Sequence, residues 1–181
     1  MPSTISTSAG AFCAVLFASS AGLADGSVVE CYDRLYSDDH LLRHPAQSVR
    51  RITVALVQDP TEAADWHHWM NVWVRFADQG IGGRNFEPGV EYGQPLRCLS
   101  AVAGAEMLEP AGTRCVIEGD GGAMEIVKRQ ASGLTLRTTG IVLEEPDWSS
   151  DQPPAELTAE GNDNVLFRLN RVDQNVCMNK W

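Results

Sequence analysis

The chain has 181 residues and a formal net charge of −10 at neutral pH. This length suits one domain with its own hydrophobic core. A strongly acidic surface repels the phosphate backbone of nucleic acid and anionic lipid, so we expect neither as a partner. Cationic ligands, basic proteins and calcium stay compatible with this charge.

Residues 1–24 have the features of a secretory signal peptide. They carry no charged side chain, include a short apolar run at 11–18, and end in small residues before Asp25. That run is too short to span a membrane. We therefore expect an exported protein, periplasmic or secreted, with a single all-β domain at 25–181 and no membrane insertion after signal removal. Because this segment lacks Lys and Arg, a disordered tail is the alternative.

Four cysteines follow the expected signal, at Cys31, Cys98, Cys115 and Cys177. An even number of cysteines in an exported chain predicts two disulfides. Of the three possible pairings we prefer Cys98–Cys115, which closes a local loop, with Cys31–Cys177, which joins the two ends of the domain. A zinc site of four thiolates is disfavoured because no pair has CxxC spacing.

Apolar and polar side chains alternate along several short stretches, which is the pattern of half-buried strands. One short helix is expected at 37–44, because Ser37 is a favourable N-cap and Pro45 ends the element. Gly- and Pro-rich residues predict loops at 78–95, with one irregular strand near 90–92, and at 145–161. The other expected strands are 27–32, 49–57, 69–77, 96–99, 113–118, 123–129, 134–143 and 164–172.

The strongest local signal covers 113–144, where three expected strands are joined by two tight turns. The first turn contains Asp120-Gly121 between two apolar runs, a typical hairpin signal. The second turn is Ser132-Gly133. This antiparallel meander and the other strands predict an all-β fold, a small antiparallel barrel or sandwich of about eight strands with one short N-terminal helix and two disulfides.

A group of tryptophans provides the candidate binding surface. Trp69, Trp73 and Arg75 alternate on the strand 69–77 with apolar residues that face the core. Exposed aromatic rings suit sugar rings or extended peptides. The alternative is that the helix at 37–44 or a loop covers them. The expected ligand-binding residues are Trp66, His67, Trp69, Trp73, Arg75 and Trp148.

The four histidines suggest an alternative function. His40 and His44 would share one face of the short helix, and together with His67 and His68 they could serve a metal-dependent hydrolase or a metal carrier. Motifs such as HExxH and GxSxG do not occur, and oxidised cysteines cannot act as nucleophiles. The acids between Glu144 and Asp163 are interpreted as a solvated loop rather than a calcium site.

The preferred hypothesis is therefore a non-catalytic binding protein for a glycan, an exported protein or a small apolar ligand inside the barrel, with no cofactor and no bound metal. A structural envelope protein without a small ligand is the third hypothesis.

Overall fold

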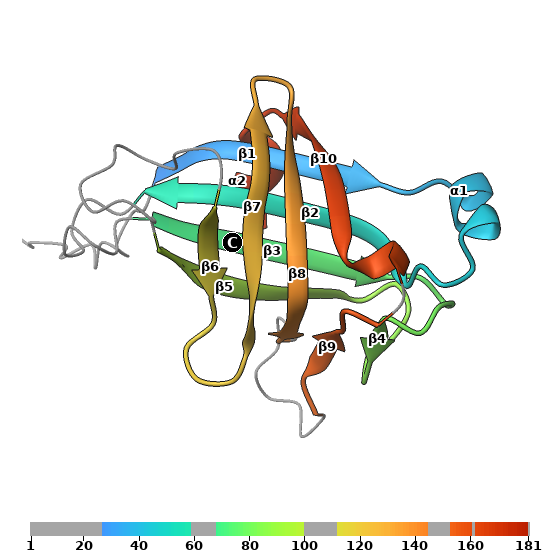
Figure 1. Cartoon of the computed structure of the whole chain (residues 1–181). Helices are drawn as coiled ribbons and strands as arrows, with labels where there is room; N and C mark the ends of the chain where they lie inside the picture. Colours follow the sequence, from blue (N-terminus) through green and yellow to red (C-terminus); the bar gives the residue numbers. More distant parts are fainter. Residues whose placement is uncertain (1–26, 59–67, 100–111, 145–152, 161, 181) are drawn as a thin grey trace, which may run out of the picture.

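The computed structural model describes residues 27–58, 68–99, 112–144, 153–160 and 162–180. Within these ranges, eight antiparallel strands form a closed barrel. Each pairs with the next, and β10 pairs with both β1 and β8, which closes the ring. The sheet folds over itself, so that β6, β7, β8 and β10 cross steeply over β1, β2, β3 and β5 (Figure 1). The barrel strands are β1 (Ser27–Leu35), β2 (Val49–Gln58), β3 (His68–Phe76), β5 (Glu91–Leu99), β6 (Thr113–Val116), β7 (Gly122–Gln130), β8 (Gly133–Leu143) and β10 (Leu166–Val172).

The all-β prediction is confirmed. Because β10 pairs with both β1 and β8, the sheet is closed, and the fold is a barrel rather than a sandwich. The short helix is also confirmed as α1 (Asp38–Arg43), with the Ser37 side chain accepting a hydrogen bond from the His40 amide. Within the described ranges no helix is long and apolar enough to cross a membrane. The remaining elements, β4 (Gly83–Arg84), β9 (Ala155–Leu157), η2 (Asn162–Asn164) and α2 (Asn175–Met178), were not predicted.

Strand β5 corrects the prediction of a loop through residue 95. It runs continuously from Glu91 to Leu99 and pairs with β3, placing Pro95 opposite Asn71. Proline is tolerated where no neighbouring strand needs its N–H. The ladder between β5 and β6 begins only at Arg97, so Pro95 removes no hydrogen bond from that side. The Gly and Pro residues in this part of the sequence were typical of a loop, but the hydrogen bonds to β3 hold the chain in a strand.

Large side chains fill the barrel interior. The apolar residues of β2 and β3 that were expected to face inward are all buried, and Phe76, Tyr92 and Phe167 have exposed fractions of 0–1%. Such packing is typical of eight-stranded barrels whose interior is a core. A small apolar ligand inside would have to displace these side chains, so the described interior gives no support to that hypothesis.

A second apolar cluster lies on the outer side of the barrel, beneath α2. The Cys31–Cys177 disulfide ties α2 to β1, and Trp69 and Trp73 pack beside it. The other disulfide joins Cys98 and Cys115, which face each other on β5 and β6. Both preferred pairings are thus confirmed.

One carboxylate is buried among basic side chains at β1. Glu30 is 7% exposed and accepts a hydrogen bond from Tyr32, while Arg129 and Arg171 lie 2.8 and 3.2 Å from its oxygens. Burial by itself would raise the pKa of Glu30, but the hydrogen bonds and the arginine charges outweigh it and hold that pKa below its ordinary value. Burial and the bond to Glu30 raise the pKa of Tyr32 to about 12.

Candidate functional site

The predicted tryptophan surface is partly used for packing. Trp69 and Trp73 lie on the outer face of β3 and are half-buried against the cluster beneath α2. The guanidinium of Arg97 covers the Trp69 ring at 4.9 Å. Arg75, on the same face, lies 3.8 Å from a Glu91 oxygen. The covering element is thus α2 rather than the helix at 37–44, and it leaves part of each indole accessible.

Three of the predicted site residues, Trp66, His67 and Trp148, lie outside the described residues. The surface that we predicted from all six side chains therefore stays a prediction, and the structure places only its β3 part.

The three histidines of the described residues, His40, His44 and His68, do not share one location. His68 lies at the start of β3, opposite Gln58, whereas His40 lies on α1 and His44 caps its C-terminal end, at the other end of the barrel (Figure 1). Within the described ranges no three His, Cys, Asp or Glu side chains are grouped so as to hold a metal ion. The hypothesis of a metal site shared by both histidine pairs therefore has no support in this part of the chain.

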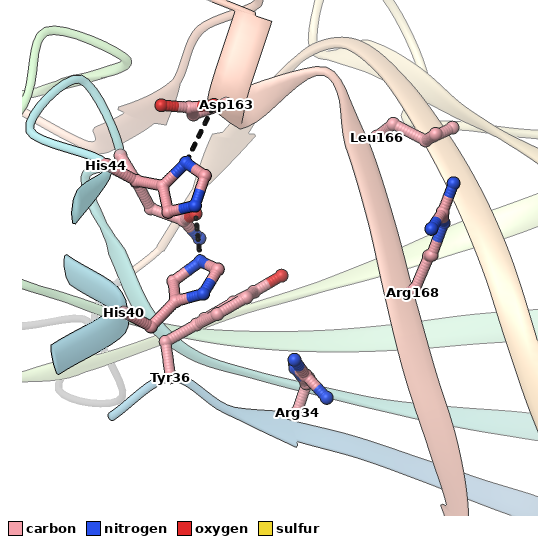
Figure 2. Close-up of a pocket in the computed structure, with 8 residues that line it drawn as sticks. Arg34, Tyr36, His40, His44, Asp163, Leu166 and Arg168 are labelled. Carbon is pink, nitrogen blue, oxygen red and sulfur yellow. Dashed lines mark hydrogen bonds and ion pairs between the residues drawn. The ribbon is translucent and has the colours of Figure 1, made fainter. Parts of the chain in front are cut away.

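A cavity of about 450 Å³ lies beside α1, where two barrel strands separate. The ladder between β1 and β10 ends at the pair Asp33–Asn170. Arg34 and Arg168 follow this pair on the two diverging strands, so both line the opening. Figure 2 shows the full lining, which consists of Arg34, Tyr36, His40, His44, Gln47, Asp163, Leu166 and Arg168.

One side of the cavity, the histidine side (His40, His44 and Asp163), is built from stacked rings. His40 and His44 are four residues apart on α1, so they share a face as predicted. Their ring centroids are 4.3 Å apart, and the Tyr36 ring continues the stack at 4.8 Å from His40. The Nδ1 atom of His44 lies 3.5 Å from a carboxylate oxygen of Asp163. An aromatic stack with an acidic end thus forms this side.

Buried hydrogen bonds hold the histidine side in place. Asn164 is fully buried, accepts hydrogen bonds from the backbone and side chain of Ser48, and donates to the Ala46 carbonyl. It thereby fixes Asp163, its neighbour in η2, against the turn after α1. Gln79 donates to three carbonyls at the end of α1 and in the following turn, those of Leu41, His44 and Gln47. These contacts tie the Gln79 side chain to the end of α1 and to the turn that follows it.

The opposite side, the arginine side (Arg34 and Arg168), carries positive charge, and neither arginine makes an ion pair with a carboxylate of the described residues. Within the described ranges, nine arginine and lysine side chains make ion pairs, but neither Arg34 nor Arg168 is among them. The guanidinium of Arg34 lies 5.2 Å from the Tyr36 ring centroid, and its buried Nε has no hydrogen-bond partner. A buried donor without a partner is costly, so the Arg34 side chain is held here at an energetic cost to the fold.

Tyr36 joins the two sides. Its hydroxyl end points toward the space beside Arg34 and Arg168, while its ring stacks on His40 (Figure 2). Burial raises the pKa of Tyr36, although contacts with Gln47 and Arg34 act in the opposite direction. The hydroxyl therefore stays protonated at neutral pH and can donate a hydrogen bond to a ligand.

The sequence prediction missed this cavity as a site, although it noted the shared face of His40 and His44. Arg34 did carry a usable signal, because it lies two positions from both Tyr32 and Tyr36 and so shares the strand face of these two buried residues. A charged residue in such a register indicates a functional contact or an ion pair. Arg168 carried no such signal, because it alternates with the inward Phe167 and Leu169 as an ordinary surface residue does.

Comparisons of the chain with protein-family models, with curated proteins and with solved structures find no match.

Proposed function

We propose that this chain is an exported, non-catalytic binding protein that holds the anionic group of a small ligand between Arg34 and Arg168. The observation that carries the proposal is the pair of arginines without carboxylate partners in the described part of an acidic protein. Most basic side chains there are neutralised by ion pairs. Two that are not neutralised line the same cavity, and guanidinium groups are well suited to bind carboxylate and phosphate oxygens.

The surroundings of the two arginines support an anion in this position. The Tyr36 hydroxyl points toward the same space and adds a neutral donor (Figure 2). Arg34 is half-buried, so its charge is less screened than that of an arginine on the open surface, whereas Arg168 is exposed. The net negative charge of the chain opposes anion binding at long range, so the local arginines must supply the attraction.

Two disulfides and the signal-like residues 1–24 support export, since disulfides persist in oxidising compartments. A binding role is favoured over hydrolysis because the described cavity lining contains no serine, threonine or cysteine. His44 and Asp163 resemble a base with its orienting acid, but a nucleophile beside them is needed for the usual covalent mechanism.

Titration by two-dimensional NMR tests the proposal, with acetate and inorganic sulfate as separate probes at constant ionic strength. We expect saturable shifts of the guanidinium signals of Arg34 and Arg168 and of the His40 ring. Arg34→Gln and Arg168→Gln should each weaken binding about 10-fold or more, because a hydrogen bond to a charged group contributes roughly 1.5–3 kcal/mol.

Arg114→Gln is the matched control. Arg114 lies exposed on β6, away from the cavity, and has no ion pair within the described ranges. The substitution removes the same charge and should leave the titration unchanged. The proposal is wrong if neither probe gives saturable shifts, or if all three variants weaken binding equally.

A further inference from the structure

We infer that the ligand of this cavity is a sugar with a single carboxylate, such as a uronic acid. The carboxylate lies on the arginine side, and the neutral hydroxyl groups face the histidine side. This inference rests on the proposed function and deepens it by naming the chemical class of the ligand.

Asp163 argues against a compact or multiply charged anion. Its carboxylate lines the same cavity as the arginines, and its side chain is 30% exposed. An ionised carboxylate accepts hydrogen bonds and repels further negative charge. A ligand that fills the cavity must therefore be negative at one end and offer neutral donors at the other. Phosphate, sulfate and dicarboxylates lack that asymmetry, whereas a hydroxylated monocarboxylate has it.

The other polar groups suit hydroxyl groups. Gln47 is 3% exposed, and its amide oxygen lies 3.3 Å from the Nε2 of His40. An amide and a neutral imidazole each combine donor and acceptor atoms, and a sugar hydroxyl does the same. The Gln47 amide also donates to the Val49 carbonyl, so it orients the His40 ring, and the groups left to meet a hydroxyl are those of His44, Asp163 and Tyr36. Sites of this kind reject analogues that leave a buried polar group unpaired.

The apolar part of the lining and the size of the cavity fit a sugar ring. Leu166, which is 40% exposed, offers apolar surface to the C–H groups of a ring. The volume of about 450 Å³ falls in the range of small-molecule sites, roughly 300–1,000 Å³. Figure 2 shows Leu166 beside Arg168, so this apolar contact lies next to the expected position of the carboxylate.

Isothermal titration of the full chain tests the inference with D-galacturonate, D-galactose and inorganic sulfate. We expect D-galacturonate to bind at least 10-fold more tightly than the other two. Asp163→Asn should strengthen sulfate binding and weaken D-galacturonate binding, because it removes both the repulsion and the hydroxyl acceptor. Arg114→Gln serves as the control, and circular dichroism verifies that each variant is folded.

The remaining outcomes separate the two proposals. Sulfate binding as tight as that of D-galacturonate, lost in Arg34→Gln, overturns the sugar inference and leaves the anion site in place. Equal binding of D-galactose and D-galacturonate, or binding of none of the probes, overturns both. Tri-galacturonate distinguishes the source of the ligand. Tighter binding of the trimer than of the monomer supports the inference and identifies a polysaccharide as the source. Tighter binding of the monomer supports the inference and identifies a free sugar acid as the source.

Discussion

Removing the Cys31–Cys177 disulfide should cost more stability than removing Cys98–Cys115. The first bridge joins residues separated by 146 positions and the second by 17. In the chain-entropy model the lost constraint on the unfolded chain is about 5 kcal/mol for the long loop and about 3 kcal/mol for the short one. All four cysteines are buried to within 2% exposure, so replacing either pair by alanine removes similar packing. The expected difference is therefore about 2 kcal/mol.

Guanidinium denaturation of the two double-alanine variants, followed by far-ultraviolet circular dichroism, measures this difference. Tryptophan fluorescence adds a local readout, because Trp69 and Trp73 pack beside the Cys31–Cys177 bridge. We expect the Cys31→Ala/Cys177→Ala variant alone to change the emission of the native state, since α2 loses its tether to β1. The loop-entropy reasoning is refuted if this variant loses no more stability than Cys98→Ala/Cys115→Ala.

Three further changes test packing and charge. Because the folded-state pKa of Glu30 is lowered, its ionisation stabilises the fold above about pH 4.5, and this contribution is lost as the pH falls through the folded-state pKa. Glu30→Gln should therefore reduce the loss of stability at acid pH, measured as urea-unfolding midpoints, and should cost about 3 kcal/mol at pH 7. Asn164→Ala should cost about 2–3 kcal/mol in the same assay, because it leaves buried groups of the turn after α1 without partners, and an unchanged midpoint would contradict this. Gly122→Ala should lower the thermal unfolding midpoint far more than Gly119→Ala. Both glycines have positive φ, but a Cβ at Gly122 would lie 1.9 Å from the Gly140 carbonyl oxygen, whereas the space at Gly119 is open. Equal losses of stability would show that backbone strain, and not the steric clash, determines the effect.

The candidate site could be predicted only in part. His40 and His44 were expected to share a face because they are four residues apart on a helix, and their rings do stack. The convergence of Arg34 and Arg168 depends on β1 and β10 pairing and then separating, and no local pattern reports where a ladder between distant strands ends. The role of Asp163 likewise depends on the buried Asn164 contacts, which connect η2 to a turn far away in the sequence.

The amino-acid sequence by itself indicated most of the barrel strands, the meander and the short helix, and it gave a preference among the three cysteine pairings. These features depend on period-two alternation, turn residues, an N-cap and cysteine number, all of which act over a few residues or follow from composition. Only the tertiary structure decided that the sheet closes through β8 and β10, and that α2 rather than α1 covers the tryptophans. It also brought two unneutralised arginines to one cavity. Such decisions depend on which distant surfaces bury each other, and that competition is settled by the packing of the whole chain.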